Sequence, residues 1–477
     1  MAVVKIRLPG APDDVQDAIN AHAEALDARK RRNRLRLSYY DSKRLLPKVA
    51  SGIIPQQYYN LGLCLGWASK AVDQLANRTN LDGFTWADGD LDSLGMGEIW
   101  EDNRLGAEID LAITANLSIG PAFLITHQGE TGEPDALIHV KDALHASGTW
   151  NTRKRAMDDL LSVTAFDDEG NISQFAYYAD NITYMAQKPK GRKWAWTPQE
   201  HRLGVPVERM AYKPTPSRPF GTSRITRPVM GLQDAATRAL IRLEGHMDVY
   251  SQPEFWLLGA DETVFKNADG TLRDIVSVRL GRIKGIPDDV DAPEGSERAD
   301  IKHFPAEDPA PHLADLNLLA KLFANEASLP HTSVAITDYA NPTSADSYDA
   351  SQHELIGVAE IATDGWGPDI KRAVVRALAI KNNVSFAEAW TQWKGIQPDW
   401  RDPRYTSRAA QADAGQKIIA SAPALANTEV GLKMLGLSPQ DVKLAMSEMK
   451  SQRAVTSIAE QIARLAAPEA PANGTAS

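Results

Sequence analysis

The sequence predicts an α+β fold, because strand-like and helix-like stretches occupy separate parts of the chain. Residues 121–212 carry short β-rich runs separated by Gly, Asn and Asp turn signals. Apolar residues spaced three and four apart predict helices over 229–250 and 312–329, and further helices in the first 80 residues and the C-terminal third. The length of 477 residues exceeds what one hydrophobic core usually organises, so two or more structural regions are expected.

The expected regions follow one another along the chain, with breaks at prolines and at changes in residue pattern. Pro253 ends one predicted helix and Pro330 stops another. Thr343, Ser344 and Asp346 resemble a capping box, which predicts that a long helix begins near Ser344. The expected regions are 1–228 (N-terminal helices and mixed sheet), 229–253 (helix), 254–310 (short strands and turns), 311–330 (helix), 331–343 (polar loop), 344–400 (long helix and following segment), 401–466 (helices) and 467–477 (disordered tail).

Composition restricts the function more than it identifies it. There are 62 acidic and 52 basic residues, for a net charge of −10, which argues against a protein whose main task is to bind phosphates. The N-terminus lacks the apolar stretch of a signal peptide, and no run of 18 apolar residues occurs, so no membrane partner is expected. The single cysteine, Cys64, is expected as a buried thiol on an apolar helix in a reducing cytoplasm.

Motifs for common chemistry are missing from the sequence, and no cofactor or metal is expected. There is no phosphate-binding loop of the G-x-x-x-x-G-K-[ST] type, no H-E-x-x-H and no G-x-S-x-G. Two groups contain residue types that can bind metal ions, but neither is expected to be a metal site. Asp88, Asp90 and Asp92 are expected to form a solvated turn. His303, Asp308 and His312 are expected to lie in a loop. The basic run over 29–36 either contacts nucleic acid or forms the solvated face of a helix, and the second interpretation is favoured.

The loop after Pro330 raises the question of catalysis, because His331, Ser333 and Asp338 are the residue types of a hydrolytic triad. Triads are normally assembled from separate elements that hold their geometry, whereas these three residues share one short loop. A hydrolase therefore stays an alternative, and a polar loop with another purpose is the preferred interpretation.

Three segments resemble the portal proteins of tailed phages, of the siphophage type found in actinobacteria. In the middle segment a strand with "LGVPV" is followed by a proline-rich loop ending in "FGTSRI", and then by a helix that opens at "LQDA" and ends at "QPEFWLLG". The others are "NPTSADSYDASQHELIGVAE" with "PDWRDPRYTSRAAQADAGQKI" after it, and the N-terminal "YYDSKRLLPKVASGIIPQQYYN". The resemblance extends from about residue 35 to 450.

The resemblance implies a portal-type fold with wing, stem, clip and crown. The wing would lie in 1–228, the two stem helices in 229–253 and 311–330, the clip between them, and the crown in 401–466. The residues expected to pack the stem helices are Leu232, Leu240, Leu243, Leu316 and Phe323. The tunnel-loop residues expected to face DNA are His331, Thr332, Ser333, Asp338, Tyr339, Asn341 and Thr343.

The resemblance also implies the function and the partners. The expected assembly is a homo-oligomeric ring, a dodecamer, at one vertex of the virion capsid, assembled in the host cytoplasm. Double-stranded DNA would pass through it, and its protein partners would be the terminase large subunit, the major capsid and scaffolding proteins and the head–tail connector. A phage scaffold or adaptor protein without a channel is the alternative.

Overall fold

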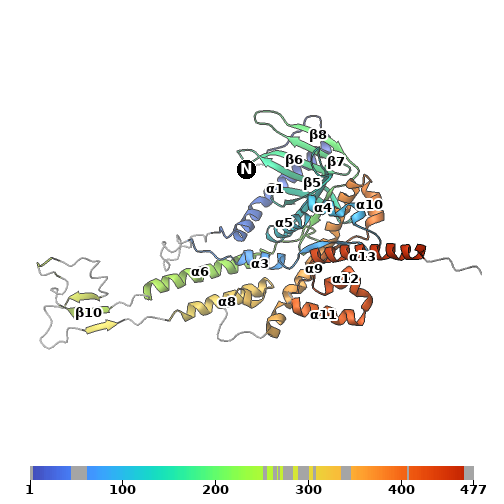
Figure 1. Ribbon diagram of the computed structural model, residues 1–477. Coiled ribbons are helices and arrows are strands. Elements are labelled where there is room, and N and C mark those ends of the chain that lie inside the picture. Colours follow the sequence, from blue (N-terminus) through green and yellow to red (C-terminus); the bar gives the residue numbers. More distant parts are fainter. Residues whose placement is uncertain are drawn as a thin grey trace, which may run out of the picture. The chain divides into compact units, whose positions relative to one another are not determined.

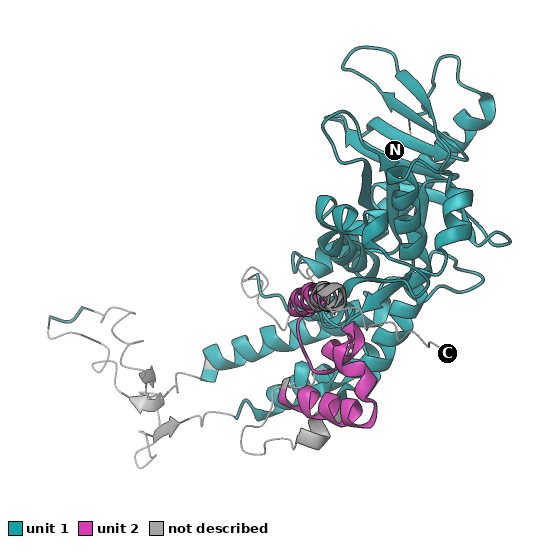
Figure 2. Cartoon of the chain, turned by 45° about the vertical axis from the view of Figure 1, so that its right-hand side comes forward, with its two compact units in different colours: residues 1–401 teal, residues 402–477 magenta. Residues whose placement is uncertain are grey.

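The computed structural model describes residues 4–44, 62–250, 255–260, 266, 269–271, 283–287, 300–303, 308–334, 345–404 and 408–466 (Figure 1). The chain divides into two compact units, Met1–Arg401 and Asp402–Ser477 (Figure 2). Helices and antiparallel sheets occupy different stretches of the chain, so the predicted α+β class is confirmed. In the described residues, no helix combines the length and the apolar character that crossing a membrane requires.

The first layer of unit 1 is a five-stranded antiparallel sheet covered on one face by α1 (Asp13–Tyr40). The alternating residues Leu161 and Val163 of the sheet pack against Ile19 and Ala23 of the helix, as the period of two in a strand requires. This confirms the strands predicted from the β-rich runs. In sheet order the strands are β4 (Ala146–Asn151), β5 (Ala156–Phe166), β6 (Ile172–Ala179), β7 (Ile182–Gln187) and β8 (Ala195–Glu200).

A smaller sheet lies at the centre of unit 1 and packs against helices in the main core. Its order is β3 (Ala136–Asp142), β2 (Ala122–Gln128) and β9 (Val207–Met210), with both pairs antiparallel. Helix α5 (Leu105–Ser118) and the long α9 (Ala345–Lys381) both contact it. The main core is therefore shared by residues far apart in sequence, including Leu124, Trp366 and Val374.

Residues 96–120 contain two helices separated by a turn. Helix α4 (Met96–Asp102) ends at a turn in which Arg104 has a left-handed backbone, with φ of 46°. The buried Asn103 side chain stabilises this turn, because its amide donates to the carbonyl oxygens of Ile99 (2.9 Å) and Ala136 (3.0 Å) and its oxygen accepts from Ile138 N (2.7 Å). The break between α4 and α5 is therefore stabilised by a contact with strand β3. The spacing of apolar residues in the sequence does not reveal this contact.

The expectation for Cys64 was wrong. Its thiol is exposed, and it precedes α3 (Trp67–Ala76) instead of lying within a helix. The apolar face of α3 begins only at Trp67, which is buried with Ala68, Ala71 and Leu75.

The second half of unit 1 contains a pair of long helices connected through short strands. Helix α6 (Arg227–Tyr250) precedes β10 (Phe255–Ala260), β11 (Ile283–Pro287) and β12 (Asp300–His303), and α8 (Ala310–Glu326) follows them (Figure 1). These strands form a small sheet in the order β11-β10-β12. After α8 come the 3-10 turn η3 (His331–Ser333), α9, α10 (Phe386–Trp393) and β13 (Gln397–Trp400), which pairs with β1 (Leu81–Thr85).

Unit 2 is helical. It contains α11 (Arg408–Ser421), the 3-10 turn η4 (Pro423–Asn427), α12 (Glu429–Met434) and α13 (Pro439–Ala466). Thr428 caps α12 by accepting from Gly431 N at 3.1 Å, and the close backbone approach of Leu425 to Gly431 leaves no room for a Cβ there. The expected disordered tail, 467–477, lies outside the described residues.

Candidate functional site

The candidate functional site is the pair α6 and α8 together with the loop after them. At 1.5 Å per residue, the 24 residues of α6 span about 36 Å and the 17 residues of α8 about 26 Å. Small buried residues, Ala236 on α6 and Ala320 and Ala324 on α8, lie where the helices meet the main core. Farther along, the rings of His246 and His312 make a T-shaped contact with centroids 5.0 Å apart, so the two helices stay paired there.

The residues predicted to pack these helices differ in their burial. Phe323 is fully buried, and its ring lies 5.1 Å from that of Trp67 on α3. Leu232 and Leu316 are half-buried and pack against the main core, whereas Leu240 and Leu243 are half-buried farther along α6. Several large apolar side chains on the two helices stay exposed, with exposed fractions of 46% for Met247, 38% for Leu313, 56% for Leu318 and 47% for Leu322.

Helix α6 also contains a buried polar residue, Gln233, that the predicted apolar stripe does not include. Gln233 lies four residues after Val229 and three before Ala236, so it shares their inward face. Its side-chain oxygen accepts a hydrogen bond from the backbone N–H of Ala68 at 2.8 Å, in the first turn of α3, where helix N–H groups lack partners. A glutamine within an apolar stripe was the signal that could have identified this contact.

The "FGTSRI" segment joins the paired helices to the rest of unit 1. The buried Arg224 guanidinium donates to the carbonyl oxygens of Ala71 on α3 and Ala327 at the end of α8, and to the Tyr212 hydroxyl (3.1 Å). Burial lowers the pKa of Arg224, which remains a cation because its ordinary pKa is so high. Beside it, Ser223 Oγ donates to Ser118 O (2.6 Å) at the end of α5.

The loop after α8 is described only at its beginning. His331 is exposed, and Thr332 and Ser333 are half-buried in η3. The ammonium group of Lys70 on α3 donates to the backbone oxygen of Ser333 at 2.5 Å, which fixes the start of the loop to α3. The other predicted loop residues, Asp338, Tyr339, Asn341 and Thr343, and the proposed cap at Ser344, lie outside the described residues.

Helix α9 is attached to the central sheet by a buried ion cluster. Glu208 Oε1 on β9 accepts from Arg372 Nε (2.9 Å) and Arg376 Nη2 (2.8 Å), and the side chains of Glu208 and Arg376 are 1% and 2% exposed. Arg376 Nε also donates to Leu203 O at 3.0 Å. Burial and the nearby Glu208 raise the pKa of Asp369 well above its ordinary value, so this neighbouring carboxyl is stabilised in its protonated form. The sequence did not reveal this cluster, because Glu208 is 164 residues from Arg372 and 168 residues from Arg376 along the chain.

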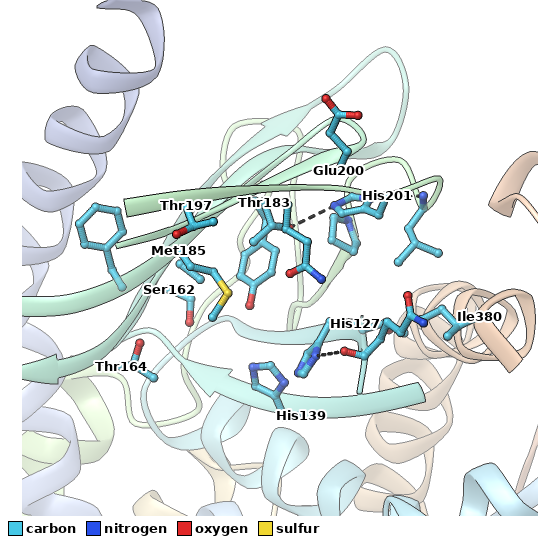
Figure 3. A pocket seen from close by; sticks show the side chains of 18 of the residues that line it. His127, His139, Ser162, Thr164, Thr183, Met185, Thr197, Glu200, His201 and Ile380 are labelled. Carbon is cyan, nitrogen blue, oxygen red and sulfur yellow. Dashed lines mark hydrogen bonds between the residues drawn. The ribbon is translucent and has the colours of Figure 1, made fainter. Parts of the chain in front are cut away.

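A pocket of about 950 Å³ lies between the five-stranded sheet and the β2–β3 pair, beside the end of α9 (Figure 3). Its labelled side chains are mostly uncharged and polar, among them Ser162, Thr164, Thr183 and Thr197. Burial, with His127 and Lys141 nearby, lowers the pKa of His139 to about 3, so His139 is a weak base at neutral pH. His201 Nε2 lies 3.1 Å from Thr183 Oγ1. A general base works best with a pKa near the working pH, which His139 does not have.

The two groups that contain metal-binding residue types make other contacts. Asp90 accepts from Asp92 N (3.1 Å) in an exposed turn. Asp308 accepts from Ala310 N (2.8 Å) at the start of α8, while His312 contacts His246. In the described part of the chain, no group of three or more His, Cys, Asp or Glu side chains is placed to hold a metal ion.

The family model described as "Phage portal protein, SPP1 Gp6-like" matches residues 21–431. The chain therefore belongs to this family of phage portal proteins, and the resemblance noted in the sequence is confirmed. The portal protein of Mycobacterium phage D29 is 26% identical over 442 residues, covering 90% of this chain and 88% of that protein. The portal protein of Mycobacterium phage L5 is 25% identical over 389 residues, covering 80% and 77%.

Two solved structures of GTA particle necks contain chains that are similar to this one. A chain titled "Neck of empty GTA particle computed with C6 symmetry" is 14% identical with a TM-score of 0.43, and it covers 81% of this chain and 95% of its own length. One titled "Neck of native GTA particle computed with C12 symmetry" is 14% identical with a TM-score of 0.37, covering 85% and 99%.

Proposed function

We propose that copies of this chain form a ring, a dodecamer, at one vertex of a tailed-phage capsid, and that double-stranded DNA enters and leaves through its central channel. The observation that carries the proposal is the portal family match over residues 21–431. In this function the protein is structural rather than catalytic. It would meet the terminase large subunit, the major capsid and scaffolding proteins and the head–tail connector during assembly in the host cytoplasm, and it would remain in the virion.

The paired helices support a ring because one copy leaves part of their apolar surface exposed. Leu318 and Leu322 lie one turn apart on α8, and the buried Ala320 and Phe323 lie on its other face. Exposed large apolar side chains on a helix surface are typical of contact with another protein. A neighbouring copy that packs its helix pair beside this one would cover these leucines.

An acidic chain also suits a conduit for DNA. Each lysine or arginine that binds a phosphate strengthens binding and would slow a moving duplex. The net charge of −10 disfavours tight binding of the DNA phosphates, so we infer a channel wall along which the duplex can slide.

Negative-stain imaging of the purified full-length chain tests the proposed ring. We expect rings with a central hole, and their rotational symmetry gives the number of copies. Compact particles without a hole would favour the scaffold or adaptor protein instead. Hydrolysis that depends on Ser333, measured in the same preparation with Ser333→Ala as the control, would favour the hydrolase.

Shortening the loop over residues 335–343 tests its proposed role as the tunnel loop. We expect rings of normal size but a loss of DNA packaging, because the loop that contacts the duplex is removed while the helix pair is unchanged. The measurement is nuclease-protected DNA per capsid, and removal of the exposed turn at 189–193 is the control for shortening a loop elsewhere. Normal packaging by the shortened loop would show that the tunnel loop is assigned wrongly.

A further inference from the structure

The second half of α1 has a concentrated positive charge. Within eight residues it contains six cations, which are Arg29, Lys30, Arg31, Arg32, Arg34 and Arg36, and we call residues 29–36 the basic segment. Across the described part of the chain, none of these six side chains forms an ion pair with a carboxylate. Burial and the neighbouring Arg32 lower the pKa of Arg36 to about 10 and also lower the pKa of Arg29. The cations of this segment therefore repel one another and form no ion pair with a carboxylate among the described residues.

A second part of unit 1 has the opposite charge. Residues 88–102, which include the 3-10 turn η1 (Asp92–Leu94) and α4, contain Asp88, Asp90, Asp92, Glu98, Glu101 and Asp102, and we call them the acidic segment. Glu98 pairs with Lys381, whereas the other five are exposed and form no ion pair with the residues that the structure describes. One exposed cation, Arg104, follows the segment, which leaves its net charge negative.

Helix α5 keeps the two segments apart within one copy. Arg36 Nη1 donates to Ile119 O (2.7 Å), which places the basic segment at the C-terminal end of α5. The acidic segment, which ends with α4, precedes the N-terminal end of the same helix. The 14 residues of α5 span about 21 Å, more than twice the Debye length of about 8 Å at physiological salt. The segments therefore do not neutralise each other across one copy.

We propose that the basic segment of one copy binds the acidic segment of the next copy in the ring. The proposal rests on the proposed ring, in which each contact joins two different faces of the chain, so that complementary charges on separate faces can meet at every contact around the ring. The charges are also similar in number, with six cations in one segment and, in the other, five carboxylates that form no ion pair with described residues.

Nucleic acid is the other occupant that a basic segment could accept. A polyanion approaching this chain meets a net charge of −10. A second copy instead brings a matching acidic surface and buries both charged segments at once. Charge complementarity of this kind sets which faces meet and how fast they do so.

Charge reversal in the full-length chain tests the contact. One variant is Arg29→Glu/Arg32→Glu, the second is Glu101→Lys/Asp102→Lys, and a third combines all four changes. Arg36 is left intact because it binds Ile119 O. The matched control is Arg192→Glu/Lys193→Glu, which reverses two exposed cations between β7 and β8. Thermal melting of each variant checks that the monomer still folds.

The readout is the protein concentration at which half of the chain is in rings, measured by sedimentation and confirmed by imaging. Each reversal is expected to raise this concentration by about tenfold or more, because like charges then face each other across every contact. The combined variant should return close to the wild-type value, and the control should not change it.

Four results would overturn the inference. If rings form equally well with either reversal, the segments do not lie at the ring contact, although the proposed function stands. If both reversals weaken rings but the combined variant is no better than either, the segments do not meet each other. If Arg29→Glu/Arg32→Glu abolishes binding of duplex DNA and leaves rings unchanged, nucleic acid is the occupant. A wild-type chain that forms no ring in any condition would overturn the proposed function itself, and the inference with it.

Discussion

Replacing Glu208 with alanine is expected to lower the free energy of unfolding of unit 1 by about 3–5 kcal/mol. Glu208 is 1% exposed and accepts hydrogen bonds from both Arg372 and Arg376. Without it, the guanidinium of Arg376 stays buried with no charge partner, and an uncompensated buried charge is strongly destabilising. Burial, the largest cause of the raised pKa of Asp369, remains when Glu208 is removed and continues to favour the protonated form of this carboxyl. Chemical denaturation followed by circular dichroism measures the change.

A double variant separates the buried charge from simple loss of volume. Glu208→Leu/Arg376→Met removes both charges and keeps most of the volume, so it should recover at least half of the lost stability. The exposed salt bridge between Lys190 and Asp168 supplies the control, because Asp168→Ala should change the stability by less than about 1 kcal/mol. A loss below about 1 kcal/mol for Glu208→Ala would show that this cluster does not hold α9 to β9.

Replacing Phe323 with alanine is expected to cost about 3–5 kcal/mol of the free energy of unfolding. The side chain is fully buried between α8 and α3, with its ring 5.1 Å from that of Trp67, so truncation leaves a cavity in the main core. The measurement is the midpoint of chemical denaturation of the full-length chain, followed by the fluorescence of the core tryptophans, which include Trp67 and Trp366.

The neighbouring Leu322 provides the matched control, because it is on the same helix but 47% exposed. Leu322→Ala should change the stability of the single copy by no more than about 0.5 kcal/mol. If copies pack their helix pairs side by side, Leu322→Ala should also weaken the ring, because Leu322 would lie at the contact between copies. Phe323→Ala should affect the ring only by destabilising the fold of each copy. Equal effects of the two variants on the single copy would mean that the buried and exposed faces of α8 are assigned wrongly.

Much of the fold could be predicted because its signals are local. The apolar spacing around Val229 and Ala236 predicted α6, and the β-rich runs around Val163 and Phe175, bounded by turn signals, predicted strands β5 and β6. The turn at Arg104 could not be predicted in this way. Its left-handed backbone is stabilised by the side chain of Asn103, which bonds to β3 more than 30 residues later.

The helices and the loop of the candidate site could be predicted from the sequence, but the contacts between them could not. The sequence located the two helices and the loop after them, and it identified Phe323 as a packing residue. It did not reveal that Gln233 accepts from the first turn of α3, or that Arg224 joins α3 to the end of α8. These contacts depend on the direction in which a polar side chain points, and an apolar pattern does not report that direction.

The sequence by itself determined the α+β class, the helix pair with strands between its members, and the resemblance to portal proteins, because hydrophobic period and residue order are properties of the chain. Only the tertiary structure decided which charges meet. Arg376 and Glu208 are paired across 168 residues, whereas the basic and acidic segments are kept apart by α5. The physical reason is that an ion pair depends on distance and burial in space, and neither quantity follows from separation along the sequence.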